Sequence, residues 1–179
     1  TLNEQLLGDY LLRNAQSDAE RALLLDKRLN DLRSTFYRQT MFADFENETH
    51  RMAKRGEPLV PDALNALHGK LNALYYGPEF VVDRELTAEW SRIPHFYRAF
   101  YVYQYATGIA AATALSRRIL SLGAPAVSDY RKFLSGGSSR HPIDMLRVAG
   151  VDMASPQPVL DTVADFEATL ARLRPLLKQ

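Results

Sequence analysis

The spacing of apolar residues along the chain predicts helices over almost its whole length. Leucine, valine, isoleucine and aromatic residues recur three and four positions apart, which places them on one face of an α-helix. No segment has the alternation of apolar and polar residues that is typical of a half-buried strand. We therefore predict an all-α fold.

Capping and turn residues divide this pattern into segments. Ser17 and Glu20 form a capping box, prolines open several segments, and glycines follow their ends. The predicted helices cover residues 3–14, 17–55, 61–76, 94–122, 125–134 and 141–150, with a last helix that starts at Pro156 or Pro158. Residues 79–93 are predicted to be a connector with one short turn around Trp90. Nothing marks an internal boundary, so residues 1–179 are predicted to form a single domain.

The apolar positions of the first and last helices predict which of their faces are buried. Amphipathic helices turn such a face toward the core of the protein. The expected inward residues are Leu2, Leu6, Leu7, Tyr10 and Leu11 in the first helix, and Val159, Val163, Phe166, Leu170 and Leu173 in the last.

Charge and composition limit the classes of partner. Lysine and arginine total 22 against 21 aspartate and glutamate residues, and the two signs alternate along the chain. This pattern lacks the cluster of positive charge that is typical of proteins that bind nucleic acid or an anionic membrane. Residues 99–116 carry no charge, but their tyrosine, glutamine and hydroxyl side chains fit a buried helix better than a membrane span. The lack of cysteine and of a leader segment favours a cytoplasmic location.

The segment from residue 95 to residue 105 is the richest in aromatic side chains, with four tyrosines, two phenylalanines and a histidine. In one continuous helix these side chains would form two neighbouring faces: Tyr97, Tyr101 and Tyr105, and beside them Phe96, Phe100 and Tyr103. A phenol hydroxyl needs a partner or water, so three stacked phenols are costly unless they line a polar cleft. This segment is therefore the first candidate for chemistry.

The histidines do not predict a metal site. No two of His50, His68, His95 and His141 have the three- or four-residue spacing that places both on one helix face. Glu46 does share a face with His50. We interpret these two residues as a solvated ion pair on a long charged helix, with a metal site as the alternative. No metal is expected to bind to ligands of this chain.

His95 has two interpretations of equal weight. It follows Pro94 at the predicted start of the aromatic helix, where it can be a capping histidine with no further role. Alternatively, its N–H and the tyrosine hydroxyls form an array of donors for a peptide carbonyl, or for the oxyanion that develops on it.

Several motifs resemble the oligoendopeptidase F family, which is grouped with thimet oligopeptidase and neurolysin. They occur in the same order as in that family and span essentially the whole chain: FYRQTMFADFE at 36–46, YYG at 75–77, WSRIPHFY at 90–97, FYVYQYATG at 100–108, FLSGGS at 133–138 and AGVDM at 149–153. The resemblance implies a helical zinc metallopeptidase that cleaves short peptides in a deep channel.

The chain also departs from that family. Such enzymes carry His-Glu-x-x-His, in which the histidines bind zinc and the glutamate is the general base, and a later glutamate is the third ligand. This chain contains no such motif. The third ligand lies in a stretch ending Ser-Thr-x-Asn-Glu, and the chain opens with Thr1-Leu2-Asn3-Glu4, so the ligand would fall just before residue 1. The resemblance therefore implies a C-terminal portion of the peptidase catalytic domain, with zinc bound only in the complete enzyme.

The family uses histidine and tyrosine side chains from the aromatic segment to hold the substrate and polarise the scissile carbonyl. Carried over residue by residue, this implies catalytic roles for His95, Tyr101 and Tyr103, and substrate-binding roles for Tyr97 and Tyr105. The family also implies that Glu4 supports the metal ligands by hydrogen bonding.

The resemblance leaves two hypotheses for the function. In the first, the chain is part of a zinc-dependent oligoendopeptidase, inactive alone, whose partners are short peptides and either the missing N-terminal portion or another copy of the chain. In the second, the chain is a non-enzymatic helical module that keeps the fold and a peptide groove without the chemistry.

Overall fold

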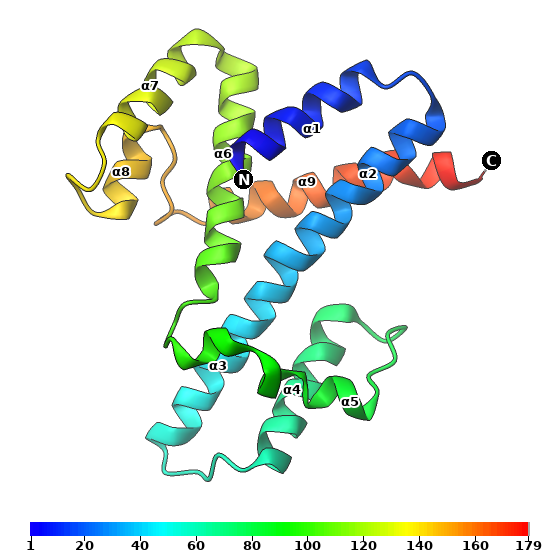
Figure 1. Ribbon diagram of the computed structural model, residues 1–179, viewed down its shortest axis with the longest axis vertical. Helices are drawn as coiled ribbons and strands as arrows, with labels where there is room; N and C mark the ends of the chain where they lie inside the picture. Colours follow the sequence, from blue (N-terminus) through cyan, green and yellow to red (C-terminus); the bar gives the residue numbers. More distant parts are fainter. Residues whose placement is uncertain (179) are drawn as a thin grey trace. The chain divides into compact units, whose positions relative to one another are not determined.

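The computed structural model describes residues 1–178, and all of the regular structure in that range is helical (Figure 1). The α-helices are α1 (Leu2–Asn14), α2 (Asp18–Leu32), α3 (Arg38–Lys54), α4 (Pro61–Tyr76), α5 (Arg84–Thr87), α6 (Tyr103–Leu122), α7 (Ala124–Ser135), α8 (Pro142–Val148) and α9 (Gln157–Leu173). A π-helical turn, Arg33–Tyr37, joins α2 to α3, and short 3-10 helices cover Glu89–Arg92, Pro94–Tyr97 and Arg174–Lys178. The predicted all-α fold is confirmed.

Most predicted helix ends are confirmed because local capping chemistry sets them. The Glu20 backbone N–H donates to Ser17 Oγ at 3.1 Å, and the Glu20 carboxylate accepts the N–H of Gln16 at 2.8 Å. Gly77 ends α4 with φ of +82°, and Gly123 ends α6 with φ of +65°. Glycine adopts this left-handed region without a steric cost, so both positions stop a helix.

The described chain forms two compact units, each with its own core. The terminal unit combines residues 1–33 with the chain from residue 107 onward, and the central unit consists of residues 34–106. The single domain expected for residues 1–179 stays a prediction.

In the terminal unit, α2 packs against α1 and α9. Its core includes a cluster of Leu2, Ala112, Leu115, Ala149 and Val151 and another of Leu12, Leu25, Leu29 and Leu173. The Arg28 guanidinium of α2 donates to Asp9 of α1 at 2.7 Å and, through two nitrogens, to Asp165 of α9 at 3.0 Å. The single positive charge of Arg28 is thus shared between two partly buried carboxylates, and these contacts link three helices.

The inward face of α1 is only partly the one predicted, since Leu2 is buried and Leu6 is half-buried against the core as expected. Leu7, Tyr10 and Leu11 are exposed, whereas Leu2, Gln5 and Leu12 are buried. The side of α1 that meets α2 and the rest of the unit is thus rotated by about one residue, or 100°, from the leucine-rich side. Val159 of α9 is also exposed, contrary to the prediction, although Leu173 is buried as expected.

Helix α6 holds most of the uncharged segment of residues 99–116. It begins only at Tyr103, and no helix within residues 1–178 combines the length and apolarity that crossing a membrane requires. The cytoplasmic location stays a prediction.

In the central unit, α3 packs against α4 around a core of Met41, Phe42, Phe45, Leu64, Leu71, Ile93 and Val102. The connector after α4 folds back onto this core, and Trp90 Nε1 donates to Asn65 Oδ1 of α4 at 2.8 Å. The predicted turn around Trp90 is confirmed, and the structure adds α5 just before it. Ile93 and Val102 are part of this core and Phe96 packs against it, so the core anchors both ends of the aromatic segment.

His68 of α4 is completely buried within this core. Its Nδ1 lies 3.1 Å from the Leu86 carbonyl oxygen, its ring packs against Phe42 and Phe45, and its Nε2 has no hydrogen-bond partner. Burial disfavours the charged imidazolium, so the pKa of His68 lies below the usual value for histidine. The folded protein therefore keeps this side chain neutral.

This buried histidine predicts a loss of stability in mild acid. Between about pH 6.5 and the lower pKa of the folded state, the unfolded chain binds a proton at His68 that the folded chain does not, so the free energy of unfolding falls by up to about 1.4 kcal/mol per pH unit as the pH is lowered. Urea unfolding of wild type and His68→Gln at pH 7, 6 and 5 measures this dependence, with exposed His141→Gln as the control. The interpretation is wrong if the slope in His68→Gln equals that of wild type.

Candidate functional site

His95 is placed by a short 3-10 helix at the edge of the central unit. Pro94 begins this 3-10 helix, and the fixed φ of proline suits the first helical position. The flanking Ile93 is buried, and the ring of Phe96 packs 5.7 Å from Phe42 and 5.4 Å from Phe45. Because its neighbours are anchored in the core, the backbone that carries the half-buried His95 side chain is held in place.

The helix predicted from Pro94 to Leu122 is interrupted, and that prediction is wrong. The 3-10 helix ends at Tyr97, and α6 starts at Tyr103. Between them, Phe100 has φ of +59° and is the one non-glycine residue with positive φ among the described residues. Tyr97, Tyr101 and Tyr105 therefore do not share one helix face.

Tertiary contacts explain the interruption. The Phe100 backbone N–H donates to Glu46 Oε1 of α3 at 2.7 Å, and Val102 is completely buried in the core. In a continuous helix the Phe100 N–H would instead donate to a backbone carbonyl of the preceding turn. The predicted solvated ion pair of Glu46 with His50 is also wrong, because Glu46 is only 4% exposed and the His50 ring packs 4.5 Å from the Phe100 ring.

The interruption brings His95, Tyr101 and Tyr105 together in an arrangement that we call the donor cluster. Tyr105 Oη lies 3.1 Å from His95 Nε2. The Tyr101 ring stacks on the His95 imidazole with centroids 5.6 Å apart and an angle of 12°, and it meets the Tyr105 ring edge-on at 5.5 Å. The Arg98 guanidinium lies over the Tyr101 ring, 4.9 Å from its centroid.

The contact between Tyr105 and His95 places one proton between two atoms. Either the hydroxyl donates to Nε2, or Nε2–H donates to the hydroxyl oxygen and the Tyr105 proton can be donated elsewhere. The hydrogen bond with Tyr101 raises the pKa of Tyr105 above the usual value for tyrosine, so its hydroxyl stays protonated at neutral pH. The cluster can thus offer O–H or N–H donors to an oxygen atom beside it.

The other predicted site residues lie outside the donor cluster. Tyr97 is 89% exposed and Tyr103 is 49% exposed. Glu4 is an exposed residue of α1. The roles predicted for Tyr97, Tyr103 and Glu4 stay predictions. Glu46 was missed as part of the site, because no sequence pattern connects it with a residue 54 positions away.

The described residues offer no site for zinc. Within residues 1–178, no group of three or more histidine, cysteine, aspartate and glutamate side chains is arranged to hold a metal ion. A protein zinc site needs at least three such ligands. The described residues therefore do not form a zinc site by themselves.

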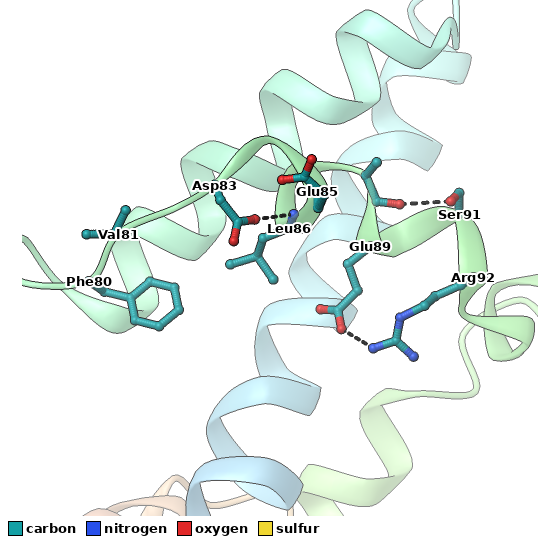
Figure 2. Close-up of a pocket in the computed structure, with 9 residues that line it drawn as sticks. Phe80, Val81, Asp83, Glu85, Leu86, Glu89, Ser91 and Arg92 are labelled. Carbon is teal, nitrogen blue, oxygen red and sulfur yellow. Dashed lines mark hydrogen bonds and ion pairs between the residues drawn. The ribbon is translucent and has the colours of Figure 1, made fainter.

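A separate pocket lies beside the connector, and Figure 2 shows its side chains. It has a volume of about 670 Å³ and is lined by Phe80, Val81, Asp83, Glu85, Leu86, Ala88, Glu89, Ser91 and Arg92. Asp83 accepts the Leu86 N–H, and Glu89 pairs with Arg92 and Arg38. Structural contacts therefore already occupy these polar groups, and none of the lining residues belongs to the donor cluster.

Comparisons with known proteins identify similar chains. The sequence model described as "Peptidase family M3" matches residues 1–165. Oligopeptidase PepF of Bacillus subtilis is 50% identical over 99% of this chain, and an oligoendopeptidase F homolog of Borreliella burgdorferi is 39% identical over the same share. The crystal structure of oligoendopeptidase-F from Enterococcus faecium superimposes with a TM-score of 0.95 at 41% identity over 99% of this chain.

These relatives are much longer than the present chain. The match covers 26% of the Bacillus protein, 30% of the Borreliella protein and 34% of the Enterococcus chain. The resemblance to oligoendopeptidase F is confirmed for the whole of this chain, and it concerns about a quarter to a third of each relative.

Proposed function

Because this chain belongs to peptidase family M3, we propose that it forms part of a zinc-dependent oligoendopeptidase that hydrolyses internal bonds of short peptides. No group of three or more candidate metal ligands lies among the described residues, so zinc would be held by residues outside this chain. By this proposal the chain is inactive alone and acts together with the rest of the peptidase. It contributes groups that bind and polarise the substrate.

The donor cluster is the observation that carries the proposal. His95 Nε2 and Tyr105 Oη lie 3.1 Å apart, and Tyr101 packs against both rings. Donors held in place before the reaction stabilise negative charge on a carbonyl oxygen more effectively than mobile donors, because they need little reorganisation. His95, Tyr101 and Tyr105 would bind the scissile carbonyl in this way.

The arrangement favours Tyr105 as a direct donor, beside the Tyr101 role carried over from the family. Tyr105 keeps its proton at neutral pH, and its oxygen lies within hydrogen-bonding distance of His95 Nε2. When His95 Nε2–H donates to the Tyr105 oxygen, it strengthens the hydroxyl as a donor toward the substrate. Tyr97 remains a proposed substrate contact and Tyr103 a proposed catalytic residue, since both are exposed and reachable by a peptide.

The proposal is tested by comparing this chain with the complete protein that contains it. An internally quenched fluorogenic peptide with a central cleavage site is incubated with each sample, with and without added zinc, and the products are identified by mass spectrometry. We expect cleavage at an internal bond by the complete protein only. A complete protein that binds the peptide without cleaving it would instead support the non-enzymatic module.

A further inference from the structure

A buried carboxylate of α3 holds the strained residue next to the donor cluster. Glu46 is 4% exposed, and its Oε1 accepts the Phe100 N–H at 2.7 Å. A carboxylate that accepts a backbone N–H forms a charge-assisted hydrogen bond, which is stronger than a bond between neutral groups. Burial of a charge is costly unless such a bond is made, so this contact is well suited to hold the backbone of Phe100 in one place.

Phe100 needs such support because of its backbone conformation. Its φ of +59° lies in the left-handed region, where the Cβ of a bulky residue crowds the backbone. Strain of this kind persists only where surrounding contacts impose it. One helical turn after Glu46, the His50 ring packs on the Phe100 ring with centroids 4.5 Å apart. Two successive turns of α3 therefore hold the backbone and the side chain of the same residue.

The direction of the chain after Phe100 determines where Tyr101 and Tyr105 lie relative to His95. Tyr101 follows at once and stacks on His95, Val102 enters the core, and α6 then starts and carries Tyr105 to His95 Nε2. If the segment were helical, as its local sequence predicts, Tyr101 would leave its stacked position. The contact of α3 with Phe100 is thus the link between the core and the cluster geometry.

We propose that Glu46 is a positioning residue that keeps Phe100 in the left-handed conformation and thereby assembles the His95, Tyr101 and Tyr105 cluster. This inference rests on the proposed function for its catalytic consequence. Its structural part, that the carboxylate sets the path of residues 98–102, stands independently of any reaction.

The test uses variants of the complete protein. Glu46→Gln keeps an acceptor oxygen, whereas Glu46→Leu removes it at a similar volume. Phe100→Pro removes the donor side of the same hydrogen bond, at a residue whose side chain is exposed. Proline has no N–H and cannot adopt a positive φ. Glu48→Gln, on the same helix but in a surface pair with Arg51, is the matched control. Crystal structures report the Phe100 φ and the His95–Tyr101 stacking, and steady-state kinetics report kcat and KM.

We expect Glu46→Gln and Glu48→Gln to keep the stacked cluster and kcat within about threefold of wild type. Glu46→Leu and Phe100→Pro should lose the stacking and lower kcat by up to about 100-fold, since misplacement of about 1 Å has effects of that size. If Glu46→Leu does not fold, Phe100→Pro decides the question alone. A stacked cluster with φ near +59° in Glu46→Leu, or an intact cluster in Phe100→Pro, overturns the inference. Loss of stacking with unchanged kcat supports the positioning role and contradicts the proposed function of the cluster.

Discussion

Replacing Tyr105 with phenylalanine is expected to lower kcat of the complete peptidase by about 100-fold, with KM changed by less than about threefold. The substitution keeps the ring and its contacts with His95 and Tyr101 but removes the hydroxyl. Without that oxygen, His95 Nε2 loses its partner at 3.1 Å, and by the proposed role the substrate would lose a protonated donor. An interaction made mainly in the transition state affects kcat, whereas general substrate binding affects KM.

Two further substitutions to phenylalanine make this measurement specific. Tyr130→Phe removes a hydroxyl from the terminal unit and leaves the ring stacked on Phe133, so its kcat should equal that of wild type. Tyr103→Phe tests the role that the family resemblance implies for Tyr103. Unchanged turnover in Tyr105→Phe together with a large loss in Tyr103→Phe would transfer the direct donor role from Tyr105 to Tyr103.

Phe42→Ala is expected to lower the free energy of unfolding by about 4 kcal/mol, the largest effect on stability that we predict. Phe42 is 1% exposed, and its ring meets Phe96 edge-on, stacks beside His68 and lies 4.4 Å from the Arg38 guanidinium. Truncation leaves a cavity beneath the turn that carries His95. Such a loss is a large part of the total stability of a typical domain, about 5–15 kcal/mol.

Urea unfolding monitored by circular dichroism measures this difference. Phe80→Ala is the matched control, because that ring is 40% exposed and stacks on Tyr76 at the surface. Its cost should be below about 1 kcal/mol. Equal losses in the two variants would show that Phe42 is not part of a close-packed core.

The helical fold could be predicted because local residues set most helix ends. Ser17, Pro61, Gly77 and Gly123 each have a capping or stopping chemistry that acts within a few residues. The faces of the helices were less predictable. Leu7 and Leu11 are the same residue type as Leu12, and which of these leucines is buried depends on the helix that packs alongside.

His95, Tyr101 and Tyr105 were among the five aromatic-segment residues named from the sequence, together with Tyr97 and Tyr103, but which of them lie together could not be predicted. Residues 95–105 contain neither glycine nor an internal proline, so nothing local marks the interruption at Phe100. The contact that imposes it comes from Glu46, 54 residues earlier in the chain. The same reason explains why Glu46 was interpreted as a solvated residue, although it is buried.

The central claim is that His95, Tyr101 and Tyr105 bind the oxygen of the scissile carbonyl. A crystal structure of the complete peptidase with a phosphinic peptide tests it most directly, because the tetrahedral phosphinyl group resembles the addition intermediate. We predict that Tyr105 Oη, with Tyr101 Oη or His95 Nε2, lies within about 3 Å of a phosphinyl oxygen. A phosphinyl group whose oxygens contact other residues, with no member of the cluster in hydrogen-bonding range, would contradict the claim.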